Sequence, residues 1–466
     1  MPVIFITDAL IFILVLMVFT YVFYARHYEH LRTPWHAVAC RPLAMSAAII
    51  LVIYIVVGLL DSVHFHPKLE STKSSDTTYS TEVTSLLDLV LDDLNKNTER
   101  TYSAPLASYS FAKEMTDLSS GKQIRAYARL KYGGAHLDNP ELDSLADITK
   151  KIFIGLVYGL SVSFVLSSFI IFILSKTHKI RFKQAFNKVC KNEFPVAWTA
   201  MIITISITLI SMSIIYNLSQ YYHVLGTDKV GQDVLFQAIK SVRTGLLIGS
   251  LTTLVMLPFA VMMGLMAGYF RGWIDDVIQY LYTTLNSIPG VLLIAASILL
   301  LQVYIGNHSD DFNSIEERAD LRLLFLCVIL GITSWTGLCR LLRAETLKLR
   351  EVDYVKAAQA FGVGNISIML RHLLPNLMHI VMITIVIDFS GLVLAEAVLS
   401  YINIGVDPSM NSWGNMINGA RMEMAREPIV WWSLAAAFVF MFVLVLAANL
   451  FSDAVRDAFD PRIRQQ

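Results

Sequence analysis

Residues 343–376 read RAETLKLREVDYVKAAQAFGVGNISIMLRHLLPN and form a polar stretch between two long apolar runs. The pattern predicts two short helices joined by the turn Gly362-Val363-Gly364. We expect Asn365 to be the N-cap of the second helix, because an Asn side chain satisfies free backbone N–H groups at a helix start. Pro375 marks the beginning of the next apolar helix.

Small residues form one face of the first of these helices, at Ala357, Ala358 and Ala360. One interpretation is an amphipathic linker that lies on lipid headgroups. Small residues and a glycine turn bury little apolar area in a bilayer, however, and they suit a helix that docks in a groove of a partner protein. The pattern favours docking.

The composition is that of an integral membrane protein. Of the 466 residues, 55% are hydrophobic and 16% are charged, whereas a soluble domain carries about 25% charged residues. Lys plus Arg and Asp plus Glu number 37 each, so no net positive charge attracts nucleic acid. The four cysteines include no Cys-x-x-Cys pair, which leaves a disulfide framework and a thiolate metal site without support.

Nine apolar runs are long enough to cross a bilayer, since a spanning helix needs about 20 residues. They lie near 5–24, 43–60, 152–174, 197–217, 244–268, 277–304, 322–340, 376–399 and 429–450. The first contains Asp8 and has neither a basic residue ahead of it nor a small-residue cleavage site behind it, so we expect a retained span and not a signal peptide.

Charge in the loops predicts the orientation, because Lys and Arg remain on the cytoplasmic side. Loops 25–42, 175–196 and 340–372 carry an excess of basic residues, whereas loop 306–320 carries five acidic residues against one Arg. Nine crossings then place the N-terminus outside and the C-terminus in the cytoplasm.

Residues 61–150, called the insert below, are the sizeable extracytoplasmic segment under this topology. A Ser- and Thr-rich part near 71–85 overlaps the start of an apolar stripe at helical spacing. The stripe contains Val83, Leu86, Leu87, Val90, Leu91 and Leu94, and Tyr102, Tyr109, Phe111, Tyr127 and Tyr132 supply a small core. His64 and His66 are too few ligands for a metal site, so a solvated turn is favoured there. The sequence assigns no role to this insert.

A glycine-rich phosphate loop is missing from the sequence. Gly121-Lys122 is followed by Gln123 and lacks the upstream glycine that cradles a phosphate. Under the family resemblance described below, we expect a protein that is not an enzyme and binds no cofactor or metal of its own. If ATP drives its work, another chain hydrolyses the ATP.

The stretch 343–376 resembles the EAA loop of binding-protein-dependent ABC importer permeases. The residues in register with that pattern are Ala357, Ala358, Gly362, Leu374 and Pro375. Lys356 stands where the family has Glu, which reverses the charge at that position. The pair Arg371-His372 is similar to the peptide and nickel branch of the family.

Other segments resemble the same family, in the expected order. They are 225–235 (LGTDKVGQDVL), 268–275 (GYFRGWID), Ile288-Pro289, Ala395-Glu396-Ala397, Ser412-Trp413-Gly414 and 456–462 (RDAFDPR). Gln232 replaces the usual Arg in the first of them. Together they cover about 225–462, and the resemblance is to the C-type permease subunit of oligopeptide, dipeptide and nickel importers.

The resemblance implies an all-α integral membrane protein of the bacterial cytoplasmic (inner) membrane, with a type I importer permease core of six spans over 197–466. Residues 1–60 (two helices), the insert, and 151–196 (a third span and a basic cytoplasmic loop) are additions to that core. The implied partners are a homologous second permease, two ATP-binding subunits that hold ATP and Mg, and an extracytoplasmic solute-binding protein. Coupling to the ATP-binding subunits is implied for loop 343–375, at Lys356, Ala357, Ala358, Gly362, Gly364, Arg371 and Pro375.

Asp388 and Glu396 are carboxylates inside the eighth span. Eight residues at about 100° each bring them within roughly 80° of one another around the helix, so both can face a protein interior. An ionisable group at this depth is a candidate functional group because it is costly to place there. Asp388 either lines the translocation path or pairs with a polar group, and both interpretations stay open, whereas a structural role is favoured for Glu396.

Trp413 lies in the outer loop 400–428, where an indole is ordinarily an anchor at the membrane interface. Contact of this loop with the binding protein is the alternative. Pro258 and Pro289 are expected to kink their spans.

The leading functional prediction is a permease subunit that forms half of a translocation path for peptides or a related small solute, with nickel and opine-like solutes open as alternatives. The second prediction is a membrane scaffold or sensor that has lost transport and binds a partner through 61–150, which Lys356 and Gln232 would favour. A secondary transporter needs coupling-ion sites and internal repeats, and neither is evident.

Overall fold

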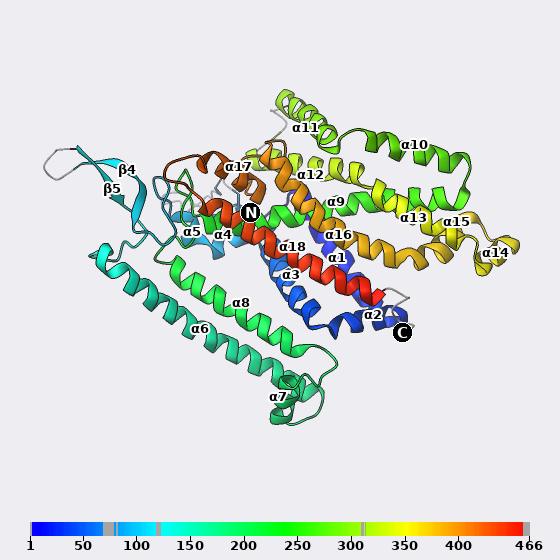
Figure 1. The fold of residues 1–466 in the computed structure, drawn as a ribbon, viewed down its shortest axis with the longest axis horizontal. Coiled ribbons are helices and arrows are strands. Elements are labelled where there is room, and N and C mark those ends of the chain that lie inside the picture. Colours follow the sequence, from blue (N-terminus) through cyan, green and yellow to red (C-terminus); the bar gives the residue numbers. More distant parts are fainter. Residues whose placement is uncertain are drawn as a thin grey trace. The chain divides into compact units, whose positions relative to one another are not determined.

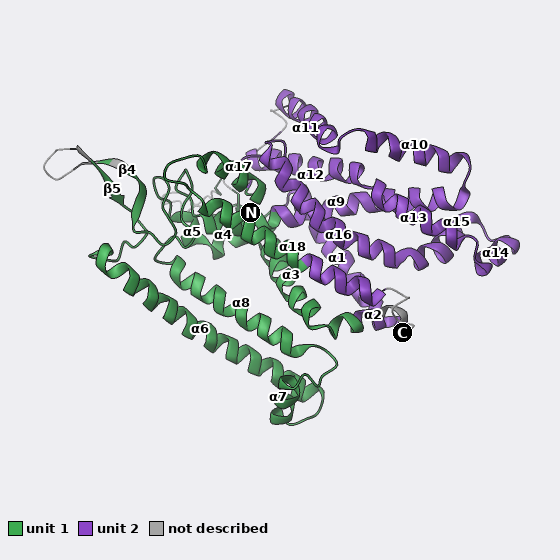
Figure 2. Cartoon of the chain, viewed as in Figure 1, with its two compact units in different colours: residues 1–3, 36–243, 411–447 green, residues 4–35, 244–410, 448–466 purple. Residues whose placement is uncertain are grey.

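The computed structural model describes residues 2–68, 79–80, 83–117, 123–308, 312 and 314–459. Most of the Ser- and Thr-rich part near 71–85, Asp310, Asp311 and the chain from Asp460 onward, including the end of the predicted RDAFDPR motif, lie outside these residues. The fold is predominantly helical (Figure 1). Its contacts divide it into unit 1 (1–3, 36–243 and 411–447) and unit 2 (4–35, 244–410 and 448–466), which Figure 2 colours separately.

Within the described residues, nine helical segments are long and apolar enough to cross a membrane. They are Ile6–His27 (α1), Pro42–Asp61 (α3), Pro140–Thr177 (α6), Trp198–Ser219 (α8), Val234–Phe270 (α9), Gly290–Asn307 (α11), Ile315–Leu349 (α12 and α13), Asn365–Tyr401 (ending in α16) and Trp432–Phe459 (α18). This confirms the predicted fold class and the number of spans.

The sixth predicted span, 277–304, is wrong at its beginning. The chain forms α10 (Trp273–Ser287), breaks at Ile288-Pro289, and begins the apolar helix α11 at Gly290. Ile288 is extended, with ψ of 128°, because a residue before proline is sterically excluded from the helical region. Pro289 is therefore the N-cap of α11 and does not kink a span, whereas Pro258 does lie inside α9.

Unit 1 contains a hairpin of two long helices, α6 and α8. An added Cβ at Gly155 or Gly159 of α6 would lie 2.8 Å from a backbone Cα of α8, at Ile214 and Ile210 respectively. The Ser213 hydroxyl of α8 also donates a hydrogen bond to the Gly155 carbonyl at 2.9 Å. This is the small-xxx-small contact by which membrane helices approach closely. Unit 1 thus combines α6 and α8 with residues 220–243 and 411–447 of the predicted core.

The insert, in unit 1, is small and partly β. A hairpin of β4 (Tyr109–Asp117) and β5 (Gln123–Arg129) accompanies a three-stranded sheet of β1 (Pro2–Val3), β2 (His64–Phe65) and β3 (Thr84–Ser85). His64 pairs with Val3 and Ser85, so a strand stands where a solvated turn was expected. The predicted helical stripe is divided into α4 (Leu86–Val90) and α5 (Asp92–Lys96), with Leu87 and Leu94 buried and Val90 exposed.

The remaining elements that lie wholly in unit 1 are α3, α7 (Phe182–Cys190), which connects α6 and α8, and α17 (Trp413–Glu423). The helix α2 (Glu29–Ala39) and the long helices α9 and α18 each contribute residues to both units.

Unit 2 contains α1, α10 to α16 and the C-terminal part of α9. The first helix packs against α12 (Ile315–Ser334) in this unit, where the backbone N–H and the hydroxyl of Thr7 both donate to the Asp320 carboxylate. Thr7 and Asp8 are 0% and 1% exposed, so the polar start of this helix is enclosed by protein. That enclosure explains how the first span tolerates an acidic residue.

Candidate functional site

The loop 343–375 lies in unit 2 and runs from α13 (Thr336–Leu349) through α14 (Asp353–Ala360) and α15 (Asn365–Ile368) to a short π-helix, η2 (Met369–Leu373), and α16 (Leu374–Tyr401). Two short helices joined by a glycine turn were predicted here, and Gly362 has φ of +73°, a conformation that glycine adopts without steric cost. The N-cap of α15 is Gly364 and not Asn365, which is already the first helical residue. The Asn365 side chain has a different partner, described below.

One side of the loop is held by apolar packing. Val355 of α14, Ile368 of α15 and Leu373 of η2 are each 0% exposed. They belong to one cluster with buried residues of α9, α10 and α13, among them Met256, Leu265, Ile278, Leu338 and Leu342. Because the anchors come from three successive elements, the loop is fixed as a body against α9 and α13.

Tyr269, near the end of α9, connects the parts of the loop by hydrogen bonds. Its hydroxyl donates to Asn365 Oδ1 at 3.0 Å and accepts from Gln359 Nε2 at 3.3 Å. Its carbonyl accepts a hydrogen bond from Arg350 Nη1 at 2.6 Å. Sequence reasoning placed Tyr269 in a family-like segment but gave it no role.

The other side of the loop is open and apolar. Phe361, Ile366 and Leu370 are 87%, 69% and 55% exposed. Ala357 and Ala360 are exposed beside them, whereas Ala358 is half-buried against the cluster. Because coupling is the role that the resemblance implies for this loop, these five exposed residues (Ala357, Ala360, Phe361, Ile366 and Leu370) are called the coupling surface below.

Charged side chains border the coupling surface. Lys356 Nζ lies 3.2 Å from a Glu351 carboxylate oxygen, and Arg271 Nη2 lies 2.9 Å from the other. The hydrogen bond and positive charge of Lys356, and to a smaller extent the charge of Arg271, hold the pKa of Glu351 below its usual value. The cation at the family's Glu position is thus paired within the chain.

The ion pair between α13 and α10 is bidentate and partly buried. Arg343 of α13 donates from Nε and Nη2 to the two carboxylate oxygens of Asp275 in α10, at 2.5 and 2.7 Å. A guanidinium and a carboxylate in this geometry make strong, directional hydrogen bonds. The pair fixes α10 against α13.

The other predicted coupling residues lie on the same loop. Arg371 and Pro375 are exposed, and Gly362 and Gly364 have no atom within 4 Å of an added Cβ. Pro375 is the second residue of α16, directly after the π-helix η2.

The two intramembrane carboxylates differ in environment. Glu396 is 1% exposed and accepts a hydrogen bond from the Ser400 hydroxyl at 2.7 Å. Asp388 is half-buried, and no hydrogen bond or ion pair reaches its carboxylate from the part of the chain that the structure describes. The structure does not bring the two together into one site.

Trp413 is 1% exposed within unit 1, and its indole N–H donates to the Ala238 carbonyl at 3.1 Å. The side chain therefore packs α17 onto α9 and is not available at the surface. A contact of loop 400–428 with another protein would have to be made by neighbouring residues.

The insert is attached to segment 225–235, called the docking segment below. Thr227 Oγ1 accepts the backbone N–H of Ser103 at 2.7 Å and donates to the Thr101 carbonyl at 2.9 Å. Gly231 has φ of +82°, and an added Cβ would lie 1.9 Å from the Glu99 carbonyl oxygen. The backbone N–H of Glu99 donates to the Gly231 carbonyl at 2.9 Å, so the two chains cross at a position that admits only glycine.

A buried ionic cluster lies at this attachment. His223 Nδ1 is 2.8 Å from Asp233 Oδ2, and His223 Nε2 is 3.6 Å from Glu99 Oε1. Burial acts to lower the pKa of His223, but the two carboxylates outweigh it and raise the pKa to about 9. Burial acts to raise the pKa of Glu99, but His223 and the backbone N–H groups of Lys131, Tyr132 and Gly133 lower it to about 2. The cluster is charged at neutral pH.

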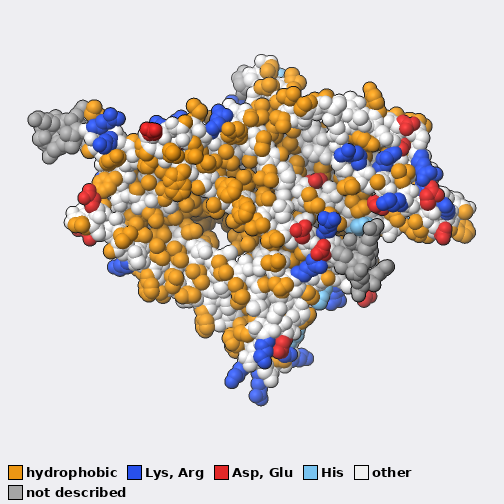
Figure 3. All heavy atoms as spheres, viewed as in Figure 1, with side chains coloured by type: hydrophobic (Ala, Val, Ile, Leu, Met, Phe, Trp, Pro, Cys, Tyr) orange, Lys and Arg blue, Asp and Glu red, His pale blue; other side chains and the backbone are white. Residues whose placement is uncertain are grey.

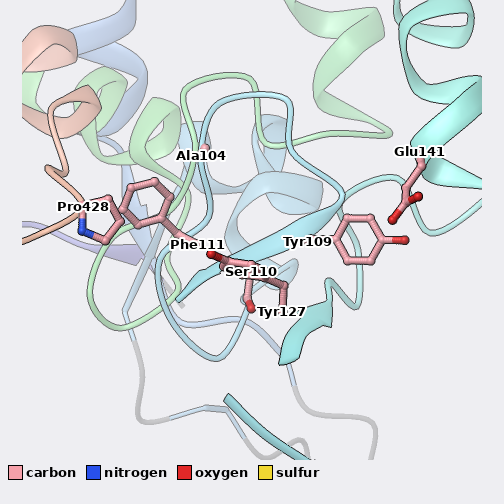
Figure 4. Close-up of a pocket in the computed structure, with 7 residues that line it drawn as sticks. All are labelled: Ala104, Tyr109, Ser110, Phe111, Tyr127, Glu141 and Pro428. Atoms are coloured by element: carbon pink, nitrogen blue, oxygen red, sulfur yellow. The ribbon is translucent and has the colours of Figure 1, made fainter. Parts of the chain in front are cut away.

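A cavity of about 590 Å³ lies at the base of the β4–β5 hairpin (Figure 4). It is lined by Ala104, Tyr109, Ser110, Phe111, Tyr127, Glu141 and Pro428. The Ser110 hydroxyl already makes hydrogen bonds within the chain, since it donates to the Ala112 carbonyl and accepts from the Ala128 N–H. Three of the seven lining residues are aromatic (Tyr109, Phe111 and Tyr127), and the cavity belongs to unit 1.

Comparison with known proteins identifies relatives of the C-terminal half. Residues 260–465 match the family described as "Binding-protein-dependent transport system inner membrane component". The chain is 30% identical over 244 residues to the glutathione transport system permease protein GsiD of Pectobacterium atrosepticum, covering 52% of this chain and 73% of that protein. It is 30% identical over 242 residues to the oligopeptide transport system permease protein OppC of Mycobacterium bovis (52% and 77%), and 30% identical over 240 residues to the dipeptide transport system permease protein DppC of Lactococcus lactis (52% and 64%).

These matches confirm the resemblance inferred from the motifs, and with it the type I importer permease fold. They cover about half of the chain, so α1 to α7 lie mostly outside the shared region. The chain is a multi-pass membrane protein and belongs to the family of inner membrane components of binding-protein-dependent transport systems.

Proposed function

We propose that this chain forms half of the translocation path of an ATP-driven importer and couples to separate ATP-binding subunits through its coupling surface. The observation that carries the proposal is that one side of the loop 343–375 is packed against the helices of unit 2 while its other side is exposed and apolar. Val355 is 0% exposed on the side of α14 that faces the helices, while Phe361 is 87% exposed at its end. Phe361 is exposed together with Ile366 and Leu370, and contiguous exposed apolar residues mark interaction sites.

The loop can transmit motion because it is attached at several points. A partner that moves α14 also moves Tyr269 through Gln359 and Asn365, and α16 through η2. Rigid elements that move together are the usual means by which transporters exchange access between the two membrane faces. The chain itself catalyses no covalent step in this scheme, and ATP and Mg are held by the partner subunits.

The proposed partners are a homologous second permease, two ATP-binding subunits and an extracytoplasmic solute-binding protein. The proposed location is the bacterial inner membrane, with the C-terminus in the cytoplasm. We favour peptides as the substrate class, because the relatives named above carry glutathione, oligopeptide and dipeptide in their names. Asp388 is the candidate to meet a peptide amino group, since its half-buried carboxylate has no partner among the described residues.

The test is purification of the full chain from its native membrane in mild detergent, with ATPase activity measured on whatever accompanies it. The wild-type chain is expected to bring ATP-binding subunits with it. Phe361→Glu is expected to weaken that association by at least about thirtyfold, since burying an aromatic anchor contributes about 2 kcal/mol or more. Leu142→Glu is the matched control, because Leu142 is 82% exposed but lies in the insert.

Two results would contradict the proposal. One is that Phe361→Glu leaves the co-purified ATPase activity unchanged. The other is loss of the partners with Leu142→Glu alone, which would favour a scaffold or sensor that binds through residues 61–150.

A further inference from the structure

The helix α7 connects the two long helices α6 and α8 and lies outside the region shared with the relatives. Ala185 and Val189 are 0% and 5% exposed and pack against Ile171 and Leu174 of α6. The Thr199 hydroxyl at the start of α8 donates to the Val189 carbonyl at 2.5 Å. These contacts hold α7 in one orientation relative to the two helices.

A second apolar face of α7 is open. Phe182 and Phe186 are 45% and 47% exposed, and Cys190 is exposed as well. The spacing i, i+4, i+8 places these three residues, called the apolar stripe below, along one side of the helix. The stripe lies next to the buried face formed by Ala185 and Val189. The apolar side of α7 is therefore covered by protein at Ala185 and Val189 and uncovered along the stripe.

The position of α7 along the hairpin places it at a membrane surface. Trp198, the first residue of α8, packs against the same buried cluster as Ala185 and Val189. Trp is enriched where a spanning helix meets the headgroup region. The apolar helices α6 and α8 lie directly before and after α7, so a bilayer that both helices cross brings the stripe to the level of the lipid headgroups.

The surroundings of the stripe are strongly basic. Loop 175–196 contains Lys176, Lys179, Arg181, Lys183, Lys188 and Lys191, all exposed, against the single acid Glu193. No carboxylate within the described residues forms an ion pair with any of the six. Figure 3 shows Lys and Arg side chains gathered at the end of the α6–α8 hairpin, where Figure 1 places α7. We call these six residues the basic patch.

We propose that α7 is an interfacial helix that binds acidic phospholipid headgroups of the membrane leaflet on its side. The apolar stripe inserts between the headgroups, and the basic patch pairs with their phosphates, which is the arrangement by which amphipathic basic helices recognise anionic membranes. An acidic lipid is the occupant that satisfies both features, since the spanning helices already place the stripe in the bilayer surface. The inference rests on α6 and α8 crossing the membrane and is independent of transport.

The first experiment measures the depth of the stripe. A nitroxide is attached to Cys190 in a Cys40→Ser background, because Cys40 and Cys190 are exposed whereas Cys327 and Cys339 are buried. In vesicles of phosphatidylcholine and phosphatidylglycerol, the label is expected to collide with oxygen more than with an aqueous nickel complex, at a depth of about 5–10 Å. Free access of the nickel complex would overturn the proposal. So would protection that appears only when ATP-binding subunits are added, which would assign the stripe to a protein.

The second experiment measures lipid selection. The full chain is equilibrated in mixed phosphatidylcholine and phosphatidylglycerol micelles, and the co-purified lipids are quantified by mass spectrometry. Neutralising Lys179, Lys183, Lys188 and Lys191 to Gln is expected to lower the phosphatidylglycerol-to-phosphatidylcholine ratio severalfold. The matched control neutralises four other lysines, Lys96, Lys113, Lys131 and Lys229, and is expected to leave the ratio unchanged. Equal ratios in the two variants would refute selection by the basic patch.

Discussion

Raising the pH from 6.5 to 9.5 is expected to loosen the insert from the docking segment, because the charge on His223 is lost. The pKa of His223 is raised to about 9 by Asp233 and Glu99, which outweigh the effect of burial. A group whose pKa is raised on folding stabilises the fold fully below its unfolded pKa of about 6.5, and that contribution is lost as the pH rises through about 9. At about 1.36 kcal/mol per pH unit the difference amounts to about 3 kcal/mol. Glu99 does not add to it, because its pKa near 2 keeps it ionised throughout this range.

Hydrogen–deuterium exchange of the full chain measures this effect locally, which suits a protein whose membrane helices do not unfold with the insert. The reporting amides are those of Lys131 and Tyr132, which donate to the Glu99 carboxylate, and that of Glu99, which donates to Gly231. After correction for intrinsic exchange rates, their protection is expected to fall about a hundredfold between pH 6.5 and 9.5. Amides within the α6–α8 hairpin are expected to change little.

His223→Gln is the decisive variant. Glutamine can still donate a hydrogen bond to Asp233 but carries no titrating charge, so protection should be low at both pH values and independent of pH. The reasoning fails if the wild-type protection changes less than about threefold, or if His223→Gln keeps the wild-type pH dependence.

Two further predictions concern helix packing. Gly159→Ala is expected to lower the midpoint of thermal unfolding in detergent, because its Cβ would lie 2.8 Å from the α8 backbone and overpacking costs about 1–3 kcal/mol. Gly391→Ala, in α16 with nothing within 4 Å of the added Cβ, should leave the midpoint unchanged or raise it slightly. Asp275→Asn is expected to destabilise unit 2 by about 1–2 kcal/mol, since it leaves the half-buried Arg343 without its charged partner. Glu345→Gln removes an exposed pair instead and should have no measurable effect. Equal midpoints for the two glycine variants, or for the two acid variants, would contradict the packing described here.

The spanning helices could be predicted because each one is a long apolar run, and hydropathy alone identifies such runs. The error at 277–304 arose where an amphipathic helix directly precedes an apolar one. Two signals marked the boundary: Asp275 and Asp276 stand in the first turn of α10, and Pro289 cannot continue a helix. The insert was harder, since its short strands pair with residues far away in sequence, as Pro2 does with Phe65.

The loop 343–375 was predictable in outline, because a glycine turn between two helices is a local pattern. Its anchorage was not, since the hydrogen bond from Tyr269 to Asn365 joins residues that are 96 positions apart. The attachment of the insert depends in the same way on Glu99 meeting His223 and Gly231. The residues of the docking segment were recognised by their resemblance to the family, yet no periodicity connects them with Glu99. What the sequence lacks here is information on which distant segments meet.

The charge reversal at Lys356 is one of the two departures from the family pattern that favour loss of transport, and the structure gives a reason to weigh it less. Lys356 is paired with Glu351, which Arg271 also contacts, so the cation is neutralised within the chain at the edge of the coupling surface. All three side chains are about half exposed, and such pairs contribute little to stability, which leaves Lys356 free to exchange partners when another protein approaches. The apolar residues that would be buried on docking lie beside this pair and are unaffected by its sign. We therefore propose that docking through the coupling surface depends on Phe361 and its apolar neighbours more than on the charge at position 356, and Phe361→Glu is the substitution that tests this.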